Sequence, residues 1–200
     1  MMVRKTFLLA AVLSVFCLLA PAADGFFGTT PSLETAEWQT LQRKIDWDLV
    51  TIPLPQDVVD YITREALACR LSMRVATLEA NVIAQMLYWA STSTREITLS
   101  EVSTWDAVGA QHIVHELAHA GAKGTGNDAQ GYNKQKEVNA RKREAEYWKD
   151  ATPKPARDSE AGFNCWANYD TVFNADGTQR SHDEIKRRLK TVYGYSQAKM

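Results

Sequence analysis

Apolar side chains recur every three to four residues in several stretches of the chain, which is the pattern of helices with one buried face. The pattern predicts helices over residues 32–47, from 57 onward, over 106–123 and from 181 onward. Another helix is expected over 134–149, with its end marked by Pro153 and Pro155. Ser32 can cap the first of these helices, and the capping box Ser181–Glu184 favours the start of the last. Gly124 can end the helix over 106–123. Residues 150–180 lack the pattern and are expected to be irregular, with a turn at 174–177.

Two short segments rich in β-branched and aromatic residues predict a hairpin. They are Ile83–Ala90 and Glu96–Leu99, and the Ser/Thr-rich residues 91–94 between them supply the turn. A helix through Met86 is the competing interpretation of the first segment. Strands among longer helices indicate an α+β fold with a small sheet.

The first residues have the three-part pattern of a secretory signal peptide. A basic start is followed by a nearly unbroken apolar run, Phe7–Ala20, and then by the small residue Ala22. The run is too short to span a bilayer comfortably, and an uncleaved anchor is the alternative. We therefore predict a signal peptide over residues 1–22 and a single domain over 23–200. That domain is expected in a periplasm or outside the cell, without stable membrane insertion.

The composition is that of an ordinary folded domain. Apolar residues make up 45% of the chain and charged residues 24%, and the formal net charge is -1. Because no basic field results, nucleic acid is not an expected partner. Two cysteines, Cys69 and Cys165, follow the predicted signal peptide. In an oxidising compartment they have one way to pair, so an intramolecular disulfide is expected, and two buried free thiols are the alternative.

The clearest chemical signal is the segment His115–His119, which reads His-Glu-Leu-Ala-His inside the helix predicted over 106–123. Two histidines four residues apart lie on the same face of a helix, so both imidazoles can bind one zinc ion. Glu116 cannot share their direction, and it can instead take a proton from water that the ion activates. Apolar residues on the opposite side of the helix, namely Ile113, Leu117 and Ala120, would seat it in a core.

This segment resembles the HExxH motif of the zincin metallopeptidases, a resemblance that covers about residues 80–150. In the gluzincin branch the third ligand is a glutamate on the following helix, in the pattern Glu-x-x-Ala. Glu137–Ala140 matches that pattern and implies Glu137 as the third ligand. The aspzincin branch uses an aspartate in GTxDxxY. Asp128 stands in a similar segment, Gly124–Tyr132, that carries two extra residues.

Other residues near the motif have narrower predicted roles. Glu144 is too far along the helix from Glu137 to bind the same ion, so it would pair with an arginine or orient a ligand histidine. Glu146 and the pair Lys142–Arg143 are expected at the solvated surface. Three residues could stabilise an oxyanion, and the sequence does not choose between them: Tyr132, Tyr169 and His182.

The resemblance implies a zincin-like α+β fold, with a small sheet on the HExxH helix and a second ligand-bearing helix alongside. It also implies peptide hydrolysis with one zinc ion, in which Glu116 acts as general base on a peptide or protein substrate. Glu96–Leu99 would then be the strand that pairs with an extended substrate. Two alternatives stay open: a zincin-fold metal-binding or interaction protein without turnover, and a zinc hydrolase that acts on a non-peptide amide.

Overall fold

The structure is a computed structural model that describes residues 33–80, 82–89, 91–101, 106–121 and 134–193. Within these residues the fold is α+β, as predicted, with a three-stranded mixed sheet and six α-helices. The helices are α1 Thr35–Lys44, α2 Gln56–Leu67, α3 Ala107–Gly121, α4 Lys134–Asp150, α5 Glu160–Val172 and α6 His182–Tyr193, with a 3-10 turn at Trp47–Thr51. The strands are β1 Leu71–Ala76, β2 Ala84–Trp89 and β3 Thr94–Ser100.

The sheet has the strand order β1-β3-β2. β2 and β3 form the predicted antiparallel hairpin, so the helical alternative for the first segment is wrong. The pattern did not reveal β1, which pairs in parallel with the other side of β3. As a result β3 is the central strand of the sheet and not an edge.

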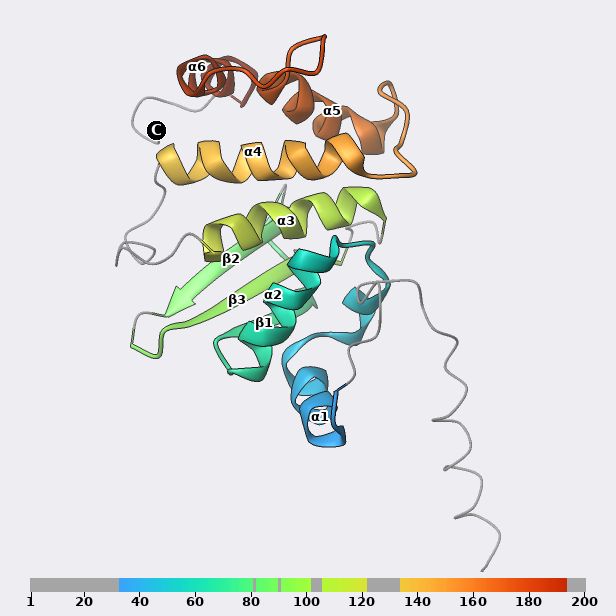
Figure 1. The fold of residues 1–200 in the computed structure, drawn as a ribbon, viewed down its shortest axis with the longest axis vertical. Coiled ribbons are helices and arrows are strands. Elements are labelled where there is room, and N and C mark those ends of the chain that lie inside the picture. The colour runs from blue at the N-terminus through green and yellow to red at the C-terminus, as the bar shows by residue number, and fades with distance from the viewer. Residues whose placement is uncertain (1–32, 81, 90, 102–105, 122–133, 194–200) are drawn as a thin grey trace, which may run out of the picture.

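The elements stack in layers, and α3 occupies the middle of the stack (Figure 1). α3 packs against β2 and β3 on one side and against α4 on the other. Met73 and Ile97 are register partners on the sheet face that contributes to the core, and both are buried with Ile113 of α3. The sheet therefore provides a fixed platform for α3, because this helix buries its apolar side in the same core.

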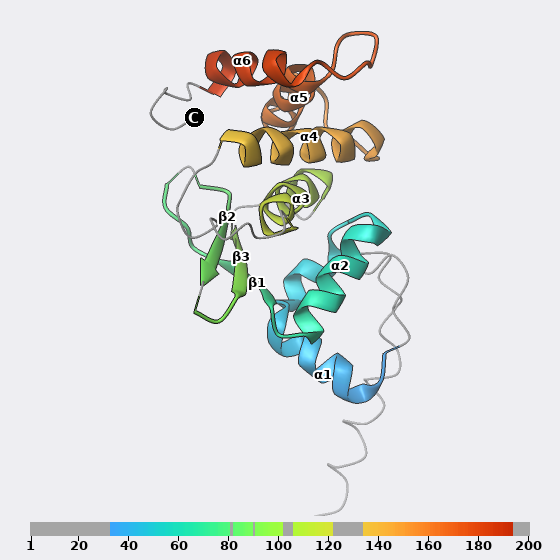
Figure 2. The ribbon, with the colours of Figure 1, turned by 60° about the vertical axis from the view of Figure 1, so that its left-hand side comes forward.

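α1 and α2 lie together beside the β1 end of the sheet (Figure 2). α5 and α6 cover the side of α4 that faces away from the sheet, as both views show. Their contact with α4 is apolar and includes Val138, Ala145, Val172, Ile185 and Leu189. α4 is consequently enclosed between α3 and the C-terminal helices.

Three predicted helix boundaries can be compared with the structure. α1 begins at Thr35 with Glu34 as its cap, whereas Ser32 lies outside the described residues. α3 begins after Asp106, whose Oδ1 accepts a hydrogen bond from the Val108 amide at 2.8 Å. At α6 the Ser181 hydroxyl accepts from the Glu184 amide at 3.3 Å, as predicted.

The expectation that residues 150–180 are irregular is wrong, because α5 lies within them. Its apolar residues are interrupted by polar and small ones, so the helical period is weak in the sequence. Contacts with α4 supply what the local pattern lacks: Trp166 packs edge-on against Trp148, and Cys165 is buried in the same cluster. The turn predicted at 174–177 is present, with Gly177 in the left-handed region at φ 79°.

The disulfide predicted between Cys69 and Cys165 is not present in the structure. Cys69 is exposed in the turn after α2, while Cys165 is buried on α5. Since α3 and α4 lie between these two elements, the sulfur atoms belong to different layers of the fold (Figure 1).

The predicted signal peptide lies outside the described residues. Among the helices that the structure describes, none combines the length and the apolar character needed to cross a membrane.

Candidate metal centre

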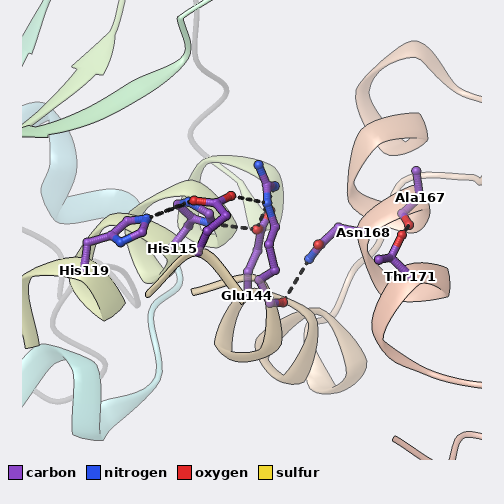
Figure 3. A network of polar contacts seen from close by, with 8 residues as sticks. His115, His119, Glu144, Ala167, Asn168 and Thr171 are labelled. Atoms are coloured by element: carbon purple, nitrogen blue, oxygen red, sulfur yellow. Dashed lines mark hydrogen bonds and ion pairs between the residues drawn. The ribbon is translucent and has the colours of Figure 1, made fainter. Parts of the chain in front are cut away.

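α3 presents His115 and His119 toward α4 (Figure 3). Because the two residues are one helical turn apart, their rings lie 4.9 Å apart between centroids, and their Nε2 atoms are 3.2 Å apart. His115 is buried, and the side chain of His119 is 19% exposed. Ile113 and Leu117 are buried in the main core on the other side of the helix, which fixes the direction of both imidazoles.

α4 brings the carboxylate of Glu137 to the same point. Its Oε2 lies 3.4 Å from His119 Nε2 and 3.7 Å from His115 Nε2. Ala140, one turn along α4, is fully buried, and its small side chain allows α3 and α4 to approach closely. His115, His119 and Glu137 converge in the structure, although 18 positions of chain separate His119 from Glu137.

The three side chains form a group that could hold a metal ion. One ligand atom from each lies within 4.8 Å of the others. Two imidazole nitrogens and one carboxylate oxygen are a donor set that zinc accepts in catalytic sites. The donor chemistry and the partial burial of the group therefore fit a single zinc ion.

Glu144 orients the first of these histidines. Its Oε2 lies 2.8 Å from His115 Nδ1, and its side chain is only 3% exposed. A carboxylate in this position favours the tautomer that carries a proton on Nδ1, which leaves Nε2 as the electron-pair donor toward Glu137 and His119. Of the two roles predicted for Glu144, this contact provides the histidine-orienting one.

Glu144 also fills its second predicted role, because it pairs with Arg141. Arg141 Nη1 donates to Glu144 Oε2 at 3.0 Å, and Arg141 Nε donates to Glu137 Oε1 at 2.9 Å. Arg141 was not among the residues predicted from the sequence. Its position four residues after Glu137 and three before Glu144 is the signal that could have found it.

The charges of this network act on both carboxylates. Burial alone would raise the pKa of Glu137, but the hydrogen bond from His119 and the charges of His115 and Arg141 outweigh it and hold that pKa well below the usual range. Burial likewise opposes ionisation of Glu144, and Arg141 and His115 together lower its pKa. Both groups are therefore held as carboxylates.

Glu116, the predicted general base, follows His115 on α3 and does not belong to the three-residue metal group. Burial raises its pKa above the ordinary value of 4.5, and the charge of Glu137 raises it further against the opposing effect of His115 and His119. A carboxyl group with a raised pKa is better suited to exchange protons near neutrality.

Four further residues were predicted as candidates for the site. Asp128 and Tyr132 lie outside the described residues. Tyr169 stacks on Phe173 with a centroid distance of 4.9 Å, and its place in the α4–α5–α6 packing is a structural one. His182 begins α6.

The assignment of Glu96–Leu99 as a strand available to an extended substrate is wrong. β1 and β2 occupy both sides of β3, so its backbone groups are already paired. The error has a simple cause, because the parallel partner β1 was not recognised in the sequence. Within the described part of the chain, β2 is the strand at the edge nearest α3.

Comparison with known proteins gave no match at any level: no protein-family model, no curated protein and no solved structure matches this chain.

Proposed function

We propose that this protein is an exported zinc-dependent metallopeptidase of the zincin type, most similar to the gluzincin branch. One observation carries the proposal: His115, His119 and Glu137 converge from two helices, and Glu116 stands next in sequence to the first of them. A site that only stored a metal would have no need of that glutamate. Export rests on the signal peptide proposed for residues 1–22.

His115, His119 and Glu137 would hold the ion. A zinc ion bound there supplies a Lewis acid and lowers the pKa of a coordinated water molecule to about 7. Glu144 keeps the His115 ring in the orientation that directs Nε2 into the site. The chain therefore contributes both the donors and the support that fixes one of them.

Glu116 would move the proton during hydrolysis. Its carboxylate accepts a proton from the attacking water as the water oxygen bonds to the peptide carbonyl carbon. It then delivers that proton to the leaving nitrogen as the carbon–nitrogen bond breaks, so the residue ends the cycle ionised. Its raised pKa favours this second transfer, because the carboxyl group takes up a proton more readily than an ordinary glutamate does.

We further propose that an extended peptide pairs with the β2 edge. β2 borders α3 and presents exposed apolar side chains, of which Leu87 is 40% and Trp89 43% exposed. Backbone hydrogen bonds to such an edge accept many sequences, while neighbouring side chains add preference. This assignment replaces the one made for β3.

The test is cleavage of an unstructured protein by the purified, zinc-loaded chain. Fragments should appear, and a chelator should prevent them. Glu116→Gln should keep the zinc and lose about 10²- to 10⁴-fold in rate, which is the usual contribution of a general base. A wild-type protein that holds zinc but cleaves neither proteins nor peptides would rule out the peptidase and leave a non-peptide amide or a binding role.

The third ligand is tested in the same preparations by elemental analysis. Wild type should carry about one zinc per chain. Glu137→Ala should lose it and Asp128→Ala should retain it. The reverse result would show that Asp128, and not Glu137, is the third ligand.

A further inference from the structure

Arg141 lies between the two acidic residues of α4 that serve the candidate metal centre. Its guanidinium uses two different nitrogens: Nε contacts Glu137 Oε1 at 2.9 Å, and Nη1 contacts Glu144 Oε2 at 3.0 Å. The side chain of Arg141 is 18% exposed, and those of Glu137 and Glu144 are 6% and 3% exposed. The three residues therefore form one partly desolvated row along α4, on the side that faces the two histidines of α3.

The two oxygens of Glu137 are divided between different partners. Oε1 receives the Arg141 hydrogen bond, whereas Oε2 is the atom 3.4 Å from His119 Nε2 and 3.7 Å from His115 Nε2. A carboxylate that binds an ion through both oxygens would have to give up or weaken the first contact. Arg141 thus biases Glu137 toward binding through Oε2 alone.

The same guanidinium connects the ligand glutamate to the ligand histidine. Glu144 Oε2 accepts from Arg141 and also lies 2.8 Å from His115 Nδ1. The chain of contacts runs from Glu137 through Arg141 and Glu144 to His115, so a shift of one ligand is resisted at the other. α5 supports the arrangement, because Asn168 Nδ2 donates to the Arg141 carbonyl oxygen at 3.2 Å (Figure 3).

We propose that Arg141 is a positioning residue that restricts Glu137 to one ligating oxygen and couples it to His115 through Glu144, which keeps a coordination position of the ion open for substrate and water. The inference rests on the metal site of the proposed function. Arginine suits this task better than lysine, since its planar group offers separate donors in a fixed geometry and is less strongly hydrated.

The experiment compares Arg141→Gln and Arg141→Lys with Arg143→Gln in the purified protein. Arg143→Gln is the matched control, because it removes the same charge from the same helix. Arg143 itself pairs with Asp57 and Glu146 on the outer side. Two properties are measured: zinc affinity by competition with a chromogenic chelator, and the visible absorption of the cobalt(II) form, which weakens as the coordination number rises. Circular dichroism establishes that each variant is folded.

Arg141→Gln should lower zinc affinity by about tenfold or more, as loss of a supporting contact to a ligand does. Its cobalt spectrum should weaken, because Glu137 can then offer both oxygens. Arg141→Lys should lie between Arg141→Gln and wild type, since it keeps the charge but not the paired donors, and Arg143→Gln should match wild type. If Arg141→Gln is unfolded, the cobalt spectrum of Arg141→Lys decides the question.

The inference is overturned if Arg141→Gln has unchanged or higher zinc affinity together with the cobalt spectrum of the wild type. A higher affinity would mean that the arginine acts only as a positive charge opposing the ion. If Arg141→Gln does not fold, a wild-type cobalt spectrum in Arg141→Lys overturns the inference. A wild-type protein that binds neither zinc nor cobalt also overturns it. Metal binding without cleavage would reject the peptidase alone, because neither readout needs turnover.

Discussion

The inner and outer faces of α4 each carry an Arg–Glu ion pair with three-residue spacing, but in different surroundings. On the inner face Arg141 pairs with Glu137 and Glu144, whose side chains are 6% and 3% exposed. On the outer face Arg143 pairs with Glu146 and with Asp57 of α2, whose side chains are 46% and 65% exposed. The predicted surface position of Arg143 and Glu146 is confirmed.

Distance does not separate the two faces. The exposed pair between Arg143 and Asp57 is the shorter one, at 2.6 Å, and the inner contacts measure 2.9 and 3.0 Å. The two faces differ in how much water surrounds the charges. When an exposed charge loses its partner, water hydrogen-bonds to it instead, whereas a buried charge is left without a partner. Burial, and not the length of the contact, should therefore decide how much each pair matters.

The largest expected effect on stability is that of Glu144→Gln. The substitution leaves Arg141 and His115 beside a neutral amide, so we expect the free energy of unfolding of the metal-free protein to fall by about 3–5 kcal/mol. Glu146→Gln, two residues along the same helix, should cost less than about 1 kcal/mol. Urea denaturation measures both, and equal losses in the two variants would show that burial does not govern these pairs.

A smaller effect should appear as the pH is lowered. The folded-state pKa of Glu144 lies below its ordinary value of 4.5, so its contribution to stability is present above about pH 4.5 and is lost as the pH falls through the folded value. The stability difference between metal-free wild type and Glu144→Gln should therefore shrink by about 1–2 kcal/mol from about pH 5 to about pH 3.

The same difference should also decline at higher pH. Burial by itself would lower the pKa of His115, but Glu144 outweighs that effect and raises it above the ordinary value of 6.5. The contribution of the imidazolium is complete below about pH 6.5 and is lost as the pH rises through the folded value. The stability difference between wild type and Glu144→Gln should therefore be greatest between about pH 4.5 and 6.5. Denaturation at a series of pH values measures it, and a difference that did not vary with pH would contradict the ionised pair.

The smallest expected effect is that of Asp57→Asn on the outer face. Because both partners are at least half exposed, we expect a loss of about 0–1 kcal/mol at low ionic strength and less in about 1 M salt, where exposed charges are screened. Thermal unfolding at the two salt concentrations measures it. A loss comparable to that of Glu144→Gln would remove the distinction between the two faces.

Most helices and the hairpin could be predicted because their patterns are local. α3 and α6 each carry a regular apolar side together with polar or glycine residues at their ends, and these features lie within a few residues of one another. β1 and α5 were missed for the opposite reason. β1 is short and follows Cys69, which adopts a positive φ of 56°, and its stability depends on β3, which follows only after β2 in the chain.

The candidate site likewise has features that follow from local sequence and features that depend on tertiary packing. Side-chain chemistry and helical period were enough to propose His115, Glu116 and His119, since i and i+4 positions must share a face whatever surrounds the helix. Glu137 was proposed from the resemblance to the Glu-x-x-Ala pattern of the gluzincins. The packing of α4 against α3 selects which glutamate oxygen meets the imidazoles and which arginine supports it. It also leaves the Arg141 side chain only 18% exposed, while that of Arg143, two residues away, is 50% exposed. Sheet pairing makes β3 the central strand, so the strand proposed to receive a peptide is β2. These outcomes depend on contacts between segments distant in the chain, and a local pattern carries no information about which neighbour will exclude the water.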